Sequence, residues 1–124
     1  MKKILIVEDE RILAVSLKMD LNDAGYTNIT LVASGEEAIM AVKEQPVDVI
    51  LMDINILGEK TGIDTADLIS GFSPVPVIYL TGETDAETKN KALATSNCKG
   101  YLTKPVNMSL LEPIMTQIFG YSLA

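Results

Sequence analysis

Asp53 directly follows four consecutive apolar residues, Val49-Ile50-Leu51-Met52, and a polar loop that contains glycine comes after it. An apolar run without polar alternation is typical of a strand covered on both faces, as in a parallel sheet. Ligands of open α/β sheets bind beyond the carboxyl ends of the strands, so Asp53 occupies a position that favours function. Taken alone, the position fits equally well an acid that only caps the strand in solvent.

Strand and helix patterns alternate along the rest of the chain. In the first helical segment, Leu13, Leu17 and Leu21 recur every four residues, which indicates one apolar face. The strands are predicted at 2–7, 28–33, 47–53, 75–80 and 100–103, and the helices at 11–24, 35–44, 61–71, 84–96 and 108–119. This alternation predicts an α/β fold, a doubly wound, five-stranded parallel sheet with five helices on its two faces.

Short motifs mark several helix boundaries. Segments 34–37 and 84–87 match the capping box, in which a hydroxyl and an acid exchange hydrogen bonds with backbone amides. Pro46 ends the second helix. Pro113 falls inside the last helix, where it should remove a backbone hydrogen bond or bend the helix.

The composition limits the classes of protein that fit. The chain has 124 residues, 48% of them hydrophobic, so it can bury one substantial core, and we expect a single domain over residues 1–124. No apolar run approaches the length of a membrane span. The first apolar run meets Glu8 too soon for a signal peptide, so we expect a first strand and a cytoplasmic protein. Cys98 is the single cysteine, which excludes an internal disulfide.

Charge and the absence of histidine narrow the chemistry further. A formal net charge of −7 makes direct binding to nucleic acid or to an anionic membrane unfavourable. Without histidine the chain lacks the commonest general base and the commonest transition-metal ligand. Carboxylates remain, and they suit hard cations such as Mg²⁺.

Several reactive side chains follow the carboxyl ends of the predicted strands, which converge on one crevice in a doubly wound sheet. Three carboxylates there would repel one another strongly, and a divalent cation would relieve that repulsion. A lysine adds positive charge, a threonine hydroxyl is a neutral donor, and a glycine amide lets an anion approach closely. These residues are Glu8 and Asp9 after the first strand, Asp53 after the third, Thr81 and Gly82 after the fourth, and Lys104 after the fifth.

Such a site suits one anionic phosphoryl group. Asp53 would accept it covalently, as carboxylate nucleophiles can, while Mg²⁺ and Lys104 neutralise charge on the phosphoryl oxygens. Taken singly, Glu8 and Asp9 fit an acid pair at a helix N-terminus, Thr81 a strand-end hydroxyl and Lys104 a solvated lysine. Their joint placement at four strand ends favours the phosphoryl site.

At these residues the chain resembles a response-regulator receiver domain, from end to end. The matching residues are Glu8-Asp9, Asp53, Thr81-Gly82, Tyr101 and Lys104-Pro105. The resemblance implies a flavodoxin-like fold with strand order 2-1-3-4-5. It also implies that Asp53 takes a phosphoryl group from a phosphohistidine on a histidine kinase or histidine phosphotransfer protein.

The resemblance further implies how the site is built. Asp9 and Asp53 would bind Mg²⁺ directly, Glu8 through water, and Asn55 through its backbone carbonyl. Lys104 would bridge to the phosphoryl group, with a cis peptide bond before the proline that follows.

The resemblance also implies a switch. Thr81 would move toward the phosphoryl oxygens, and Tyr101 would swing inward to fill the space that it leaves. The face of the fourth helix, fifth strand and last helix would then change its affinity for a downstream output protein or domain, or for a second copy of the chain. Asn55 and Glu83 would tune loss of the phosphoryl group.

The chain departs from the family in the loop after Asp53, which is one residue longer before Gly62 and leaves the start of the third helix open. One alternative function is a small Mg²⁺-dependent aspartyl-phosphate phosphatase, but that enzyme needs an acid where this chain has Asn55. A flavin carrier is another, but the acids after the first strand, beginning with Glu8, would repel the cofactor phosphate. A receiver unit of a larger hybrid kinase or transcription factor would have the same site chemistry.

Overall fold

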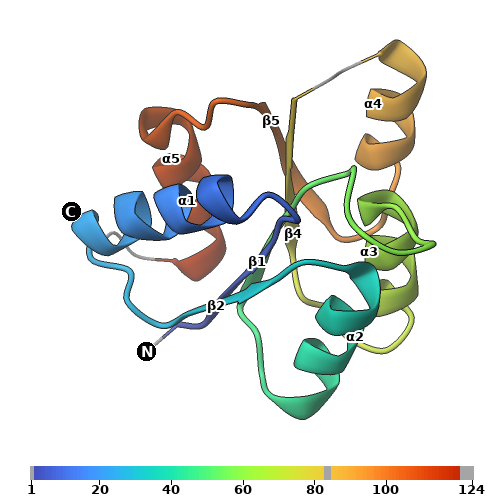
Figure 1. Ribbon diagram of the computed structural model, residues 1–124, viewed down its shortest axis with the longest axis horizontal. Helices are drawn as coiled ribbons and strands as arrows, with labels where there is room; N and C mark the ends of the chain where they lie inside the picture. Colours follow the sequence, from blue (N-terminus) through green and yellow to red (C-terminus); the bar gives the residue numbers. More distant parts are fainter. Residues whose placement is uncertain (1, 83–84, 121–124) are drawn as a thin grey trace.

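The computed structural model of the chain describes residues 2–82 and 85–120. Five strands alternate with five helices, and the sheet runs between two layers of helices (Figure 1). The strands are β1 Ile4–Val7, β2 Ile29–Val32, β3 Val49–Met52, β4 Val77–Thr81 and β5 Cys98–Thr103. The helices are α1 Arg11–Asp23, α2 Gly35–Glu44, α3 Gly62–Ser70, α4 Ala86–Leu93 and α5 Met108–Phe119.

The strands form one parallel sheet in the order β2-β1-β3-β4-β5. This order confirms the predicted doubly wound, flavodoxin-like fold. Every residue of β1, β3 and β4 is buried, whereas β2 lies at the sheet edge and is only partly buried. The continuous apolar run that ends at Asp53 is therefore a central strand with both faces covered.

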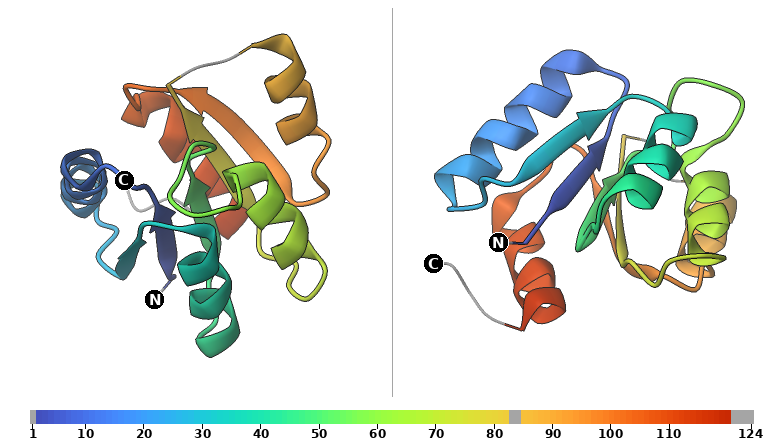
Figure 2. Two further views of the ribbon diagram at one scale, coloured as in Figure 1. Left: turned by 45° about the vertical axis from the view of Figure 1, so that its right-hand side comes forward. Right: turned by 90° about the horizontal axis from the view of Figure 1, so that it is seen from below.

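The helices divide the core in two (Figures 1 and 2). The first core lies between the sheet and α1 and α5, and the second between the sheet and α2, α3 and α4. We call them the α1/α5 layer and the α2–α4 layer. Strand β5 serves both, since neighbouring side chains on a strand face opposite sides. Leu102 packs in the α1/α5 layer and Tyr101 in the α2–α4 layer.

The helix caps agree only partly with the predicted motifs. Ser34 caps α2 by accepting a hydrogen bond from the Glu37 N–H, as predicted, but the Glu37 carboxylate accepts from the Ala33 N–H. At α4 the capping residue is Asp85, which accepts from the Thr88 N–H, so the predicted box at 84–87 is wrong by one residue. Thr84 itself lies outside the described residues. Helix α5 continues through Pro113, which removes one backbone donor without ending the helix.

Two neighbouring tyrosines of the sheet differ in their hydrogen bonding, so removing their hydroxyl groups should affect stability differently. The Tyr79 hydroxyl lies 2.9 Å from Thr95 Oγ1 and must donate to it, because Thr95 donates its own proton to the Ala92 carbonyl at 2.7 Å. Burial raises the pKa of Tyr79 to about 12. The Tyr101 hydroxyl is buried and has no hydrogen-bond partner within the described residues.

We therefore expect Tyr79→Phe to lower the free energy of unfolding by about 1 kcal/mol, the usual net value of one hydrogen bond. Tyr101→Phe should leave it unchanged or raise it, because no hydrogen bond is lost. Urea denaturation of the two variants measures both effects. Equal losses would contradict the assignment of the Tyr79 hydrogen bond.

Candidate functional site

Adjacent strand ends bring Glu8 and Asp53 together. Strands β1 and β3 pair in parallel with Val7 opposite Met52, so the next residue of each strand leaves the sheet at the same edge. The Asp53 N–H donates to the Val7 carbonyl at 3.0 Å. Both acids are buried, with Glu8 7% and Asp53 6% exposed. The predicted convergence of these acids is therefore observed.

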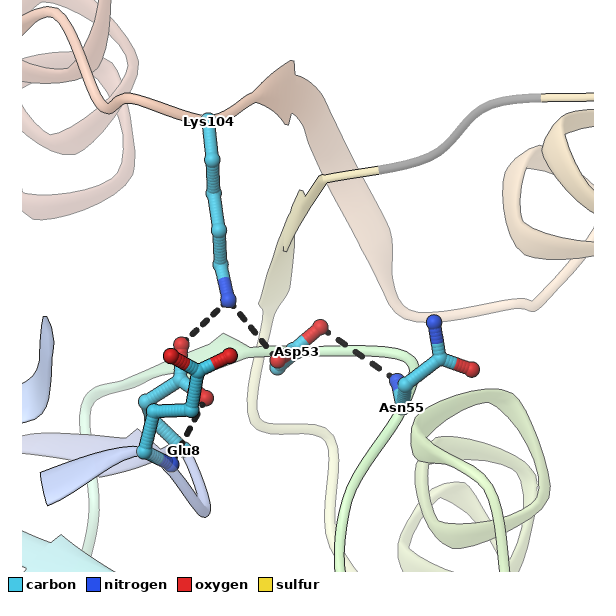
Figure 3. Close-up of polar contacts among 5 residues, drawn as sticks. Glu8, Asp53, Asn55 and Lys104 are labelled. Atoms are coloured by element: carbon cyan, nitrogen blue, oxygen red, sulfur yellow. Dashed lines mark hydrogen bonds and ion pairs between the residues drawn. The ribbon is translucent and has the colours of Figure 1, made fainter.

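Lys104 reaches the two acids from the connection between β5 and α5. Its backbone N–H donates to the Thr81 carbonyl at 2.8 Å, which holds the connection beside the end of β4. Its ammonium group donates to the carboxylates of both Glu8 and Asp53, with 2.8 Å between Nζ and Asp53 Oδ2 (Figure 3). The Lys104–Pro105 peptide bond is cis, as the resemblance implied.

Asp9 completes an acidic cluster, which we define as Glu8, Asp9 and Asp53. One carboxylate oxygen of each residue lies within 4.8 Å of those of the other two. Lys104 can neutralise only one of these three charges, so the cluster keeps a negative excess. Closely spaced carboxylate oxygens are the ligands that Mg²⁺ prefers, and the cluster could therefore hold such an ion.

Burial and neighbouring charges together shift the pKa values of Glu8 and Lys104. Burial, the largest cause, raises the pKa of Glu8 to about 7; Lys104 opposes this rise and Asp53 adds to it. Burial alone would lower the pKa of Lys104, but its hydrogen bonds to Asp53 and Glu8 outweigh burial and raise it. Lys104 therefore stays positively charged at neutral pH.

The raised pKa of Glu8 predicts how stability depends on pH in the metal-free protein. Glu8 has a pKa of about 7 in the folded chain, against an ordinary value of 4.5. Between these two pH values the folded state binds more protons than the unfolded state, so the free energy of unfolding falls as pH rises.

We expect Glu8→Gln to remove this decline, so that the variant gains stability relative to the parent across that pH window. Urea denaturation in a chelating buffer at several pH values measures the difference. Parallel pH profiles for the two proteins would contradict the prediction.

Asn55 contacts the Asp53 carboxylate through its backbone. Its N–H donates to Asp53 Oδ1 at 3.3 Å, while its side chain extends away from Asp53 (Figure 3). Asn55 and Thr81 line a cleft of about 310 Å³. A cavity of about 140 Å³ lies on the α1 side and is lined by Asp53 and Lys104. Asp53 thus lines the cavity on the α1 side, while its neighbour Asn55 lines the cleft.

The loop that follows Asp53 is tied to the start of α2. The Leu57 N–H donates to the Ala33 carbonyl at 3.3 Å, and Lys60 Nζ lies 3.6 Å from Glu36 Oε1. Gly58 has φ +95°, and a Cβ there would come within 2.6 Å of the Glu36 carboxylate. The longer loop therefore has a definite conformation that uses a glycine.

A full capping box starts the helix after this loop. Thr61 accepts from the Asp64 N–H at 3.1 Å, and the Asp64 carboxylate accepts from the Thr61 N–H at 3.2 Å. These bonds place the first residue of α3 at Gly62. The start of the third helix, left open by the sequence, is thereby fixed.

The other predicted site residues lie along β4 and β5. Thr81 is the buried last residue of β4, and a Cβ on Gly82 would meet no atom of the described residues within 4 Å. Tyr101 pairs with Tyr79 across β4 and β5 and is not part of the acidic cluster. Glu83 lies outside the described residues.

One backbone contact beside Asp53 escaped the sequence analysis. The Gly62 N–H donates to the Ile54 carbonyl at 2.7 Å, and a Cβ on Gly62 would lie 2.1 Å from the Asp53 carbonyl oxygen. No side chain fits there. The signal in the sequence was a glycine near the start of the predicted third helix. The pattern alone indicated a helix start and no contact with Asp53.

A family model for the response regulator receiver domain matches residues 4–116. The chain belongs to this family. The receiver domain is 38% identical to the transcriptional regulatory protein YvrH of Bacillus subtilis over 104 residues, which cover 84% of this chain and 43% of that protein. It is 34% identical over 108 residues to the transcriptional regulatory protein KdpE of Mycobacterium tuberculosis, with 87% and 46% covered. The chain thus spans less than half the length of these curated relatives.

Solved structures show the same fold. The signal receiver domain of a modulated diguanylate cyclase from Desulfovibrio desulfuricans has a TM-score of 0.87 and 32% identity, with 97% of this chain and 94% of that one covered. Chemotaxis protein CheY4 of Vibrio cholerae has a TM-score of 0.81 and 30% identity, with 95% and 98% covered. In the described part of this receiver domain, none of the helices has the length and apolar character needed to cross a membrane.

Proposed function

We propose that this receiver domain accepts one phosphoryl group on Asp53 from a phosphohistidine of a histidine kinase or histidine phosphotransfer protein. The observation that carries the proposal is the Lys104 ammonium bound between the buried carboxylates of Glu8 and Asp53. An acid that only capped its strand would be solvated. Here Asp53 contacts a cation, lies close to two further acids and lines a cavity, and this environment suits group transfer.

In the transfer, an Asp53 carboxylate oxygen attacks phosphorus. The bond between phosphorus and the imidazole nitrogen breaks, and its electron pair returns to the imidazole. Lys104 stabilises the charge on the phosphoryl oxygens, and the Thr81 hydroxyl and the Gly82 N–H donate hydrogen bonds to them. The Asn55 N–H keeps the carboxylate oriented.

The acidic cluster would hold Mg²⁺ through Asp9 and Asp53 directly, through Glu8 by way of water, and through the Asn55 carbonyl. When bound, Mg²⁺ supplies positive charge that stabilises the transferring phosphoryl group. Lys104 cannot replace this charge alone, because it is shared between two carboxylates. Without the cation, the negative excess of the cluster would repel an anionic phosphodonor.

Phosphorylation would then bias a two-state equilibrium of the domain. Thr81 and Tyr101 report the event to the face formed by α4, β5 and α5, which binds an output protein or domain, or a second copy of the chain. We assign residues 1–124 to a single signalling domain in the cytoplasm, which acts as a phosphoacceptor and not as an enzyme on other substrates. With its net charge of −7, the domain itself binds neither nucleic acid nor membranes.

Incubation with acetyl phosphate and Mg²⁺, followed by measurement of intact mass, tests this function. We expect a single phosphoryl adduct that hydroxylamine removes, as it removes acyl phosphates, and that does not form in a chelator. Failure to form the adduct in the presence of Mg²⁺ would contradict the proposal. Rapid multiple-turnover hydrolysis of unrelated phosphomonoesters would identify the aspartyl-phosphate phosphatase instead.

A further inference from the structure

Two side chains contact the ring of Tyr101 inside the α2–α4 layer. The ring of Tyr79 lies against it, with 6.3 Å between centroids and 50° between planes. The ammonium group of Lys89, on α4, lies 5.6 Å from the Tyr101 ring centroid. The ring of Tyr101 is thus contacted by a strand residue and by a helix residue.

The first of these contacts is fixed. Tyr79 is fully buried, and its hydroxyl is bonded to Thr95 at 2.9 Å. Thr95 follows α4 and is itself bonded to Ala92 in the last turn of that helix. Tyr79 is therefore held rigidly beside the Tyr101 ring, and it also anchors the C-terminal end of α4.

Within the described residues, no hydrogen bond of the Tyr101 hydroxyl holds the ring in place. The hydroxyl is buried, yet it makes no hydrogen bond to any of them. The contacts that orient the ring are therefore those on its faces and edges. Of these, the contact with Lys89 is the one that comes from a charged and exposed side chain of α4.

Lys89 is also available for this contact. In the described part of the chain it forms no ion pair, whereas Lys91, on the same helix, lies 3.5 Å from Glu87. A cation over the face of a tyrosine ring is attracted by the negative potential of that face. Lys91 therefore provides a matched control, since it has the same charge in the same helix without the ring contact.

We propose that Lys89 is a positioning residue for Tyr101, whose cation–π contact holds the ring against Tyr79 and so couples α4 to the switch tyrosine. The inference rests on the proposed function, in which Tyr101 reports phosphorylation. An exposed contact of this kind changes the population of the held orientation by about two- to fivefold. We expect the loss of this contact to change the equilibrium between the switch states and not the phosphoryl chemistry, because Lys89 is not part of the acidic cluster.

Nuclear magnetic resonance of protein labelled with ¹³C-tyrosine tests the contact without any phosphodonor. The Tyr101 signals are assigned with Tyr101→Phe, and the cross-peak between the rings of Tyr79 and Tyr101 is measured. We expect Lys89→Met to weaken this cross-peak, Lys89→Arg to retain it, and Lys91→Met to leave it unchanged. An unchanged cross-peak in Lys89→Met would overturn the proposal, as would equal weakening in Lys89→Arg, which keeps the cation.

A second measurement separates this inference from the proposed function. The same spectra are recorded while beryllofluoride, an analogue of the phosphoryl group, is added with Mg²⁺. We expect Lys89→Met to shift the half-saturating concentration about two- to fivefold, and Lys91→Met to leave it unchanged. If beryllofluoride does not bind the parent, the proposed function fails, while the ring cross-peak still decides the role of Lys89. If beryllofluoride binds the parent and Lys89→Met with the same half-saturating concentration, coupling through Lys89 is disproved.

Discussion

Asp53→Asn will reduce the phosphoryl adduct formed from acetyl phosphate and Mg²⁺ to background. The amide retains the shape of the carboxylate, but its single oxygen can replace only one of the two carboxylate oxygens that accept from Lys104 and Asn55. It cannot act as the nucleophile, because its nitrogen and oxygen share their electrons in the amide group. It also removes one ligand charge from the acidic cluster. Intact mass and the hydroxylamine-sensitive fraction measure the loss.

Asp48→Asn is the matched control for this substitution. Asp48 directly precedes the same strand, at its opposite end, where its carboxylate accepts from the Lys3 N–H at 2.7 Å. An asparagine oxygen can accept that bond, so adduct formation should match the parent. A full adduct in Asp53→Asn, or an equal loss in both variants, would exclude Asp53 as the acceptor.

Gly62→Ala will destabilise the domain more than any other single methyl addition that we describe. The new carbon would lie 2.1 Å from the Asp53 carbonyl oxygen, and backbone atoms cannot move aside as a flexible side chain can. We expect the free energy of unfolding to fall by about 3 kcal/mol, the upper part of the range for overpacking. The thermal midpoint should fall by about 10 °C in a domain of this size.

The control for Gly62→Ala is Gly82→Ala. Within the part of the chain that the structure describes, a Cβ on Gly82 would meet no atom within 4 Å, so the free energy of unfolding should change by less than about 0.5 kcal/mol. Differential scanning calorimetry of both variants gives the comparison. A Gly62→Ala protein as stable as the parent would show that α3 does not pack tightly against the Asp53 backbone.

Much of the fold and the site could be predicted because it depends on local patterns and on one rule of topology. The apolar run before Asp53 identified a central strand, and the alternation of elements implied a parallel sheet. Side chains at parallel strand ends then had to converge, which brought Glu8, Asp53 and Lys104 together. The order of the strands came from the family resemblance, since alternation alone does not fix it.

Element boundaries were less predictable, because tertiary hydrogen bonds set them. Helix α4 ends at Leu93, earlier than predicted, and the Thr95 hydroxyl then bonds to the Ala92 carbonyl and receives Tyr79. Strand β5 starts at Cys98, earlier than predicted, and its pairing with β4 shifts register between Val77 and Ile78. No periodic pattern in the sequence encodes such a shift.

The contacts of Gly62 and Lys89 could not be predicted for a related reason. Each joins a helix residue to a residue outside that helix, Gly62 to Asp53 and Lys89 to Tyr101. Each depends on how closely these segments pack. A glycine at a helix start and a lysine on an exposed helix face are common features of many sequences. Their particular roles become visible only when their neighbours across the fold are known.

The alternation of side chains along β5 has a consequence for how the domain tolerates insertions and deletions. Tyr101 faces the α2–α4 layer and Leu102 faces the α1/α5 layer. Removing a single residue from this strand before Tyr101 would exchange these directions and turn the tyrosine away from Tyr79 and Lys89, even if Lys104 still reached Asp53. Such a variant would test whether the proposed phosphoryl acceptance at Asp53 can be separated from the proposed switch at Tyr101.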